Sequence, residues 1–185
     1  MIPNREQAFE LLKKYTKSEA LITHALAVES VMKHFAEKHN EDIEKWGVIG
    51  LCHDLDYDQF PEQHCTKTKE ILVDEDWDEE YIRAIVSHGW GVCSDVEPKS
   101  LLEKTLFAID ELVGLIYACV LVRPEKKIDG LELKSVKKKW KIKTFAAGAN
   151  RDVITKGAEM LNVELDSLIQ DTIDGMKKFS SEIGI

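Results

Sequence analysis

The chain has 185 residues, 44% of them hydrophobic and 32% charged, and its formal net charge is -9. This length and balance predict one soluble domain with a sizeable core, and the acidic charge argues against a protein that coats nucleic acid. No apolar run is long enough to cross a bilayer and the first residues lack a secretory signal, so we expect a cytoplasmic protein without a membrane partner.

The N-terminal part of the sequence predicts two helices. Asn4 and Gln7 have the spacing of a capping box, and a short apolar face follows them. Ser18 is the expected start of a longer helix that ends near Lys38. The apolar residues of this helix recur at steps of three and four, and His24 falls on the same stripe, so we expect this histidine on the buried side.

Three further helices are predicted before residue 90. Asp42 begins the first, which we expect to continue through the His53-Asp54 pair. An acidic and aromatic loop over residues 56–61 ends in a proline, which is typical of a helix start, and the helix over 61–73 carries His64. The third helix is expected over 76–88, because the glycine that follows is a common helix stop.

The C-terminal half is also predicted to be helical. A long apolar helix is expected over residues 98–122, and it contains Asp110 in a surround where an unpartnered carboxylate is costly. Residues 134–143 form a basic run interleaved with apolar residues, and two more helices are expected at 151–161 and 165–183. No alternating pattern is strong enough to predict a sheet, so the expected fold class is all-α.

Four side chains from three predicted helices have the chemistry of metal ligands. They are His24, His53, Asp54 and Asp110. Their spacing is not that of a zinc finger, so we expect a site assembled by packing in the core of a bundle. Two imidazoles and two carboxylates suit iron, manganese, cobalt, nickel, zinc or magnesium. Taken alone, His24 is more often a hydrogen-bonded core histidine, whereas Asp110 on an apolar helix is harder to explain without a partner.

These residues resemble the pattern of the HD superfamily, a family of all-helical, metal-dependent phosphohydrolases with a His…His-Asp…Asp series. His24 matches the first histidine, and His53-Asp54 matches the doublet, in the setting Leu-Cys-His-Asp-Leu. Asp110 matches the last aspartate, in the setting Ala-Ile-Asp-Glu-Leu. The resemblance spans about residues 18–122 and implies an HD-type multi-helix bundle with a buried metal site.

Two more histidines match an extended form of this pattern. The subgroup related to HDIG proteins adds two histidines between the doublet and the last aspartate, and His64 and His88 occupy that interval. The resemblance implies that they bind a second ion and that Asp54 bridges the two ions. The alternative for His64 is a helix surface, and for His88 a helix C-terminus favoured by the dipole. His34 and His39 are expected at the surface.

The sequence departs from HDIG relatives directly after the doublet, where Leu55 and Asp56 stand in place of Ile-Gly. We expect this change to place Asp56 and Asp58 near the mouth of the site. Either carboxylate there is a candidate for proton transfer, so the predicted catalytic residues are Asp54, Asp56 and Asp58.

Basic side chains are expected to orient the phosphate of a substrate. The lysines over 134–143 are a local exception on an acidic protein, and the alternative for them is a solvated face. The candidates for substrate binding are Lys67, Arg123, Lys137, Lys138 and Lys141, with Lys69 and Lys139 beside them. The four cysteines form no CxxC pair and are expected to be reduced packing residues.

The sequence thus predicts a single HD-type domain over residues 1–185, with a metal-binding core at about 18–122 and a helical extension at about 124–185. The implied activity is hydrolysis of a small phosphate ester, a nucleotide or another phosphomonoester, by water activated at one or two divalent ions. Two alternatives stay open, a di-iron oxygenase of the same superfamily and a non-catalytic metal-binding signalling module.

Overall fold

The structure is a computed structural model that describes residues 1–178 and 180–185. The secondary structure of these residues is helical, apart from an isolated bridge between Trp90 and Ser94, which confirms the predicted all-α class. The helices are α1 (Arg5–Tyr15), α2 (Glu19–His39), α3 (Ile43–Leu51), the 3-10 helix η1 (Pro61–Gln63), α4 (Thr66–Asp74), α5 (Glu79–Ser87), α6 (Leu101–Leu121), α7 (Leu133–Trp140), α8 (Arg151–Leu161), α9 (Leu165–Lys178) and α10 (Ser180–Ile183). None of these described helices is long and apolar enough to cross a membrane.

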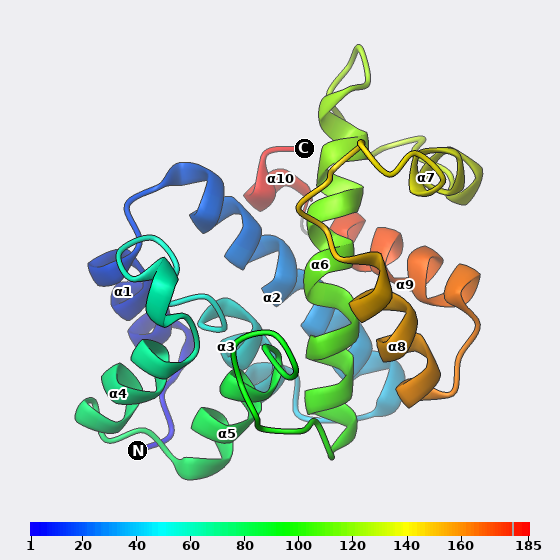
Figure 1. Ribbon diagram of the computed structural model, residues 1–185. Helices are drawn as coiled ribbons and strands as arrows, with labels where there is room; N and C mark the ends of the chain where they lie inside the picture. The colour runs from blue at the N-terminus through cyan, green and yellow to red at the C-terminus, as the bar shows by residue number, and fades with distance from the viewer. Residues whose placement is uncertain (179) are drawn as a thin grey trace.

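Helices α2 and α6 form the centre of the molecule. Helix α2 packs against α3, α6 and α9, and α6 also packs against α8. In Figure 1, α6 runs through the middle, with α1, α4 and α5 on one side of it and α7, α8 and α9 on the other. Each central helix buries a long apolar stripe, which includes Val28, Val31 and Met32 of α2 and Leu106, Ile109 and Leu112 of α6. The core therefore fixes the polar side chains that the same two helices carry.

Local signals in the sequence set where several helices begin. Asn4 and Gln7 form the predicted capping box of α1. A second capping box, between Ser100 and Glu103, starts α6 close to the expected position. Ser18 occupies the N-cap of α2, as predicted, although its side chain makes no capping hydrogen bond. Helices that carry such signals lie where the sequence places them.

Helix α3 is shorter than predicted. It ends at Leu51, and the chain then turns, so His53 and Asp54 lie beyond the helix rather than on it. The physical reason is a side chain that completes the helix end. The ring of His53 donates from Nδ1 to the carbonyl of Gly50 at 2.8 Å, which satisfies a carbonyl that has no partner within the helix.

The predicted helix over residues 61–73 is divided in two. The 3-10 turn η1 ends before His64, and Cys65 has a left-handed backbone with φ 66, so α4 begins only at Thr66. The buried carboxylate of Asp56 accepts a hydrogen bond at 2.8 Å from the amide of Thr68, in the first turn of α4. A loop residue 12 positions before Thr68 therefore caps α4, and His64 lies on a connection instead of a helix.

The C-terminal helices pack on the two central helices. The helix expected over 165–183 is described as α9 and α10, and residue 179 between them lies outside the described residues. His34 is not a surface residue as predicted, because its side chain is 15% exposed. Gly175 of α9 lies so close to α2 that an added Cβ would come within 3.1 Å of His34 Cβ, and this close packing covers the ring.

Candidate metal centre

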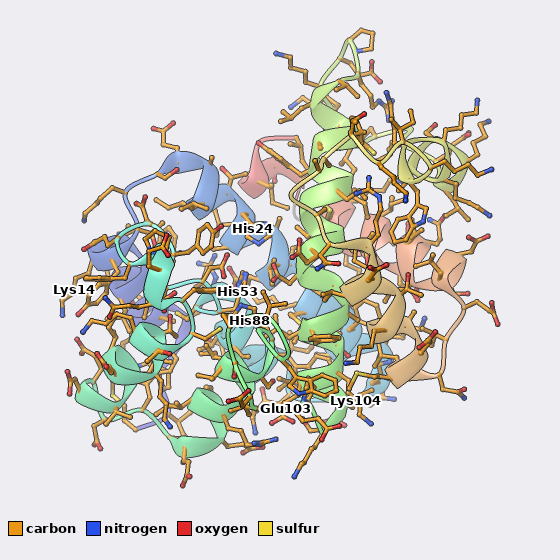
Figure 2. All side chains as sticks on the ribbon, in the orientation of Figure 1. Lys14, His24, His53, His88, Glu103 and Lys104 are labelled. Atoms are coloured by element: carbon orange, nitrogen blue, oxygen red, sulfur yellow. The ribbon has the colours of Figure 1, made fainter. Side chains whose placement is uncertain are left out.

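His24 and Asp110 meet where the two central helices pack together. His24 Nε2 of α2 lies 2.9 Å from Asp110 Oδ1 of α6. Figure 2 shows the side chains of His24, His53 and His88 gathered on one side of α6. A pair separated by 86 residues in the sequence is thus brought together by helix packing alone.

A glycine near the end of α3 brings the doublet to the same place. A Cβ added at Gly50 would lie 2.9 Å from Met32 Cγ and 3.2 Å from the Val28 carbonyl oxygen of α2. The missing side chain therefore lets α3 pack closely against α2. As a result, the ring centroids of His53 and His24 lie 5.2 Å apart.

The first group of candidate ligands consists of His24, His53, Asp54 and Asp110. His53 Nε2 lies 3.2 Å from Asp110 Oδ1 and 3.4 Å from Asp54 Oδ2, and His24 Nε2 lies 3.9 Å from the same Asp54 oxygen. Ligand atoms at ~2.1 Å from one ion are roughly 3.0 Å apart in octahedral geometry and 3.4 Å apart in tetrahedral geometry. The observed separations have the size that one shared ion requires.

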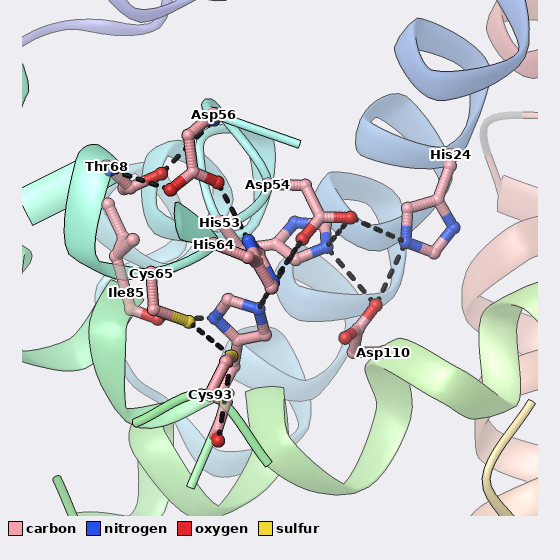
Figure 3. Close-up of polar contacts among 12 residues, drawn as sticks. His24, His53, Asp54, Asp56, His64, Cys65, Thr68, Ile85, Cys93 and Asp110 are labelled. Carbon is pink, nitrogen blue, oxygen red and sulfur yellow. Dashed lines mark hydrogen bonds and ion pairs between the residues drawn. The ribbon is translucent and has the colours of Figure 1, made fainter. Parts of the chain in front are cut away.

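A second group uses the other oxygen of Asp54. Asp54 Oδ1 lies 3.4 Å from His64 Nε2 and 3.5 Å from His88 Nε2, and the two Nε2 atoms are 3.2 Å apart. Figure 3 shows Asp54 between His64 on one side and His24 on the other. The Asp54 carboxylate therefore presents one oxygen to each group, as a ligand that bridges two ions would do.

Three of the histidines have their Nδ1 atoms occupied. His53 donates to the carbonyl of Gly50, His88 donates to the carbonyl of Ile85 at 2.6 Å, and His64 donates to Asp56 Oδ1 at 2.7 Å. A proton on Nδ1 leaves the lone pair on Nε2, which is the atom that faces the site in each case. This outer arrangement of carbonyls and a carboxylate is the one that orients histidine ligands in metalloproteins.

The buried face of the site contains a polar atom without a partner. His53 is fully buried, and its Nε2 makes no hydrogen bond within the described residues, although carboxylate oxygens lie 3.2 and 3.4 Å away. Leaving a buried imidazole nitrogen unsatisfied is costly. A divalent cation would remove this cost, so the residues present fit such an ion.

The neighbouring charges shift the pKa values of the candidate ligands, upward for two histidines and downward for Asp54. Burial lowers the pKa of His53, but the Asp54 and Asp110 carboxylates outweigh it and hold that pKa well above 6.5. Burial likewise lowers the pKa of His64, and its hydrogen bond with Asp56 raises it to about 10. Burial raises the pKa of Asp54, but His53 then holds it well below its usual range. Protons and metal ions therefore compete for the same Nε2 atoms.

A cavity of about 540 Å³ lies beside both groups. Five of the six candidate ligands line it, and the sixth, His53, lies behind them. The rest of the wall comes from Leu21, Tyr57, Gly89, Val92, Cys93, Glu111, Gly114, Ala118, Ala146, Gly148, Ala149 and Val153. The candidate ligands are thus accessible to a small molecule.

The structure corrects the role expected for Asp56. This residue is fully buried, and its two carboxylate oxygens accept from the ring of His64 and from the amide of Thr68. It does not line the cavity. The sequence placed it at the mouth because it follows the doublet so closely, but the turn after α3 directs it inward, where it positions His64.

The predicted position of Asp58 at the mouth of the site is also wrong. Its Oδ2 accepts from the backbone amides of Lys17 and Ser18, at 2.6 and 3.0 Å, and these bonds hold its pKa below the usual value. Asp58 therefore fastens the loop between α1 and α2, and it does not line the cavity. Of the three carboxylates expected to be catalytic, Asp54 alone reaches the cavity.

The predicted phosphate-binding residues lie elsewhere. Among the described residues, none of Lys67, Arg123, Lys137, Lys138 and Lys141 lines the cavity. Lys67 pairs with Glu70 at 2.7 Å, Lys137 pairs with Asp166 at 2.5 Å, and Arg123 pairs with Glu125. Lys138 and Lys141 are exposed on and just after α7. The structure gives no support for contact between these side chains and a substrate.

Three residues near the site were not predicted from the sequence. Cys65 and Cys93 lie beside His64, with their Sγ atoms 3.0 Å apart, and the three form a further group that is able to hold a metal ion. The hydrogen bond from the Cys65 thiol lowers the pKa of Cys93 to about 5. Glu111 lines the cavity beside Asp110, and burial raises its pKa. The position of Glu111 directly after a candidate ligand was the one available signal.

A comparison with protein families identifies the chain. The HD domain model matches residues 21–114, a range that contains all six candidate ligands. No curated protein and no solved structure matches the chain. Because the family match covers half of the chain, the resemblance seen in the sequence is confirmed. The chain belongs to the HD domain family, whose general activity is metal-dependent hydrolysis.

Proposed function

We propose that the protein hydrolyses small phosphomonoesters at a centre that holds two divalent ions. The observation that carries the proposal is the placement of Asp54, whose two oxygens face different histidine groups beside one cavity. His24, His53 and Asp110 would hold one ion, and His64 and His88 would hold the other. Asp54 would contribute one oxygen to each.

The charge of this arrangement suits a phosphomonoester dianion. The Asp54 and Asp110 carboxylates are the anionic candidate ligands, and the histidines bind a metal as neutral rings. With two divalent ions held, roughly two positive charges remain to balance the phosphate. The bound ions would supply the Lewis acidity that acidifies water and withdraws charge from the phosphoryl oxygens.

The chain's own residues contribute orientation. His53 is locked by the carbonyl of Gly50 and His88 by the carbonyl of Ile85, so neither ring is free to rotate. Asp56 fixes His64 in the same way from a buried position. A preorganised set of ligands keeps the reacting groups in place without reorganisation during the reaction.

The test is a panel of phosphomonoesters, nucleotides included, with the protein reconstituted with Mn²⁺ or Co²⁺. We expect release of inorganic phosphate that requires metal and does not require oxygen. The Asp54→Ala variant should lose this activity with its helical circular dichroism unchanged. Glu37→Gln removes a carboxylate from an exposed pair with Lys178 and serves as the control, which should retain activity. Metal binding without turnover on any substrate would support a signalling module instead.

A second candidate function follows from the number of imidazoles. Four histidines around one shared carboxylate would also suit a pair of iron ions. Some HD relatives with the extended histidine set are di-iron oxygenases. Bound iron together with substrate-dependent oxygen consumption would favour this candidate over hydrolysis.

A further inference from the structure

We propose that the cavity wall away from the candidate ligands binds the organic part of the substrate and selects an uncharged or cationic group over an anionic one. This inference rests on the proposed function, because it concerns the part of the substrate that remains after phosphate is released. It is carried by the chemistry of the wall, which differs sharply from that of the candidate ligands.

The side chains of this wall are small and mostly apolar. On the side formed by α6, α8 and the loop between α7 and α8, it consists of Glu111, Gly114, Ala118, Ala146, Gly148, Ala149 and Val153. A Cβ added at Gly114 or at Gly148 would meet no heavy atom within 4 Å. These two glycines therefore border open space, and this space is available to a group of a few heavy atoms.

The charge of the wall is negative. Among the residues that the structure describes, no lysine or arginine lines the cavity, and Glu111 is the one carboxylate there outside the candidate ligand set. An anionic substituent on the substrate would face Glu111 in a partly buried space where no lysine or arginine of the described residues offsets its charge. A hydroxyl or an ammonium group would instead donate a hydrogen bond to it.

Glu111 has the capacity to make this contact. Its Oε2 accepts from the backbone amide of Asn150 at 3.1 Å. A carboxylate has about four acceptor sites, so this one bond leaves several for a substrate. The same bond joins the loop to α6, which keeps the carboxylate and the facing wall at a fixed separation.

In addition to Glu111, one arginine side chain holds the loop that forms the facing wall. The guanidinium of Arg151 donates to backbone carbonyls along residues 140–149, those of Trp140, Ile142, Phe145, Ala146 and Ala149. Such a set of bonds fixes a loop that has no regular structure of its own. The wall is therefore preformed, and selection by charge does not depend on a loop closing over the substrate.

The experiment compares substrates that differ mainly in the charge of the organic group. Phosphoethanolamine carries an ammonium group and 2-phosphoglycolate a carboxylate on skeletons of similar size. With the Mn²⁺-loaded protein, we expect kcat/KM for phosphoethanolamine to exceed that for 2-phosphoglycolate by about 10-fold or more. In Glu111→Gln, whose amide oxygen still accepts from Asn150, the ratio should fall to within about 3-fold. An unchanged ratio, or a wild-type preference for 2-phosphoglycolate, would overturn the inference.

A binding measurement separates this inference from the proposed function. The phosphonates 3-aminopropylphosphonate and 3-phosphonopropionate replace the ester oxygen by carbon and are not hydrolysed as esters. Calorimetry should give tighter binding of the amine to the wild type, and Glu111→Gln should lose that preference while the control Glu37→Gln keeps it. If the wild type prefers the amine, Glu111→Gln loses this preference and no phosphatase activity is found, hydrolysis is rejected but the selective wall is supported. Equal binding of both phosphonates by the wild type would reject the selective wall even if hydrolysis is observed.

The space beside Gly114 gives a separate test. The Cβ of Gly114→Leu would meet no heavy atom within 4 Å, so we expect the fold and the metal content to be retained. We expect kcat/KM for the bulky p-nitrophenyl phosphate to fall by about 10-fold or more, with a smaller loss for phosphoethanolamine. Equal effects on both substrates would show that the organic group does not enter this part of the cavity.

Discussion

Asp54 links the two histidine groups at the scale of single residues. Each of its oxygens lies within 3.5 Å of a histidine Nε2 in a different group. The grouping of the six candidate ligands was predictable because His24, His53, Asp54 and Asp110 match the family series and the other two histidines match its extended form. The roles of Asp56 and Asp58 were not, because their hydrogen-bond partners lie 12 and about 40 residues away in the sequence.

Asp56 should act on metal binding through His64. Asp56→Asn removes the charge that orients the ring, and loss of such an outer partner typically lowers metal affinity by about 10- to 100-fold. We expect this loss for one of the two bound ions, measured by calorimetric titration with Mn²⁺. Asp58→Asn, two residues further on, is the matched control and should bind both ions as the wild type does. A larger effect of Asp58→Asn than of Asp56→Asn would contradict the assignment.

Metal binding should release protons. The pKa of His64 is raised to about 10, so at pH 7 its ring carries a second proton that an ion must displace from Nε2, and the carboxylates beside His53 shift its pKa in the same direction. Metal affinity should therefore rise as pH increases from about 6.5 toward 10. Calorimetry at pH 7 in buffers of different ionisation enthalpy measures this release directly. Binding with no net proton release at pH 7 would contradict these pKa directions.

At the scale of helices, the sequence predicts best where a helix carries its own signals. The bounds of α8 match the prediction, and α6 lies within one or a few residues of it. The end of α3 and the start of α4 were missed because they depend on the ring of His53 and the carboxylate of Asp56, which reach them only in the folded chain. As a result, the His53-Asp54 doublet and His64 lie outside the helices.

The packing of α6 against α8 should depend on one glycine. A Cβ added at Gly157 would lie 2.5 Å from Ala108 Cα and Cβ, whereas one added at Gly114 meets nothing within 4 Å. Gly157→Ala should therefore destabilise the fold by about 1–3 kcal/mol. Gly114→Ala, also in a helix, should stabilise it by about 0.5–1 kcal/mol. Denaturant unfolding of both variants checks this, and equal stability of the two would contradict the packing described.

At the scale of the whole molecule, the site joins segments that are distant in the sequence. Helices α2 and α6, the connection before α4 and the end of α5 supply one candidate ligand each, and the turn after α3 supplies two. The family pattern anticipated this assembly, but not where the basic residues would lie. The lysines of α7 face solvent because their neighbours Val136 and Trp140 pack against the core. Tertiary packing determines this orientation of the helix.

Because the ligands come from so many segments, metal should stabilise the whole fold. Binding at about 100 times the dissociation constant adds about 2.7 kcal/mol. For a chain of this size, that corresponds to a rise in Tm of about 5–10 °C. Thermal melts before and after treatment with a chelator measure the change. An identical Tm with and without metal would mean that the ion does not bridge these segments.

The central claim is that Asp54 and the five other candidate ligands form a centre that holds two ions. The most direct test is the metal content per chain. After loading with Mn²⁺ and removal of excess ion, the wild type should hold about two ions and His88→Ala about one. Asp54→Ala should lose ions from both groups, since each uses one of its oxygens. If Asp54→Ala instead holds as many ions as the wild type, the centre described here is contradicted.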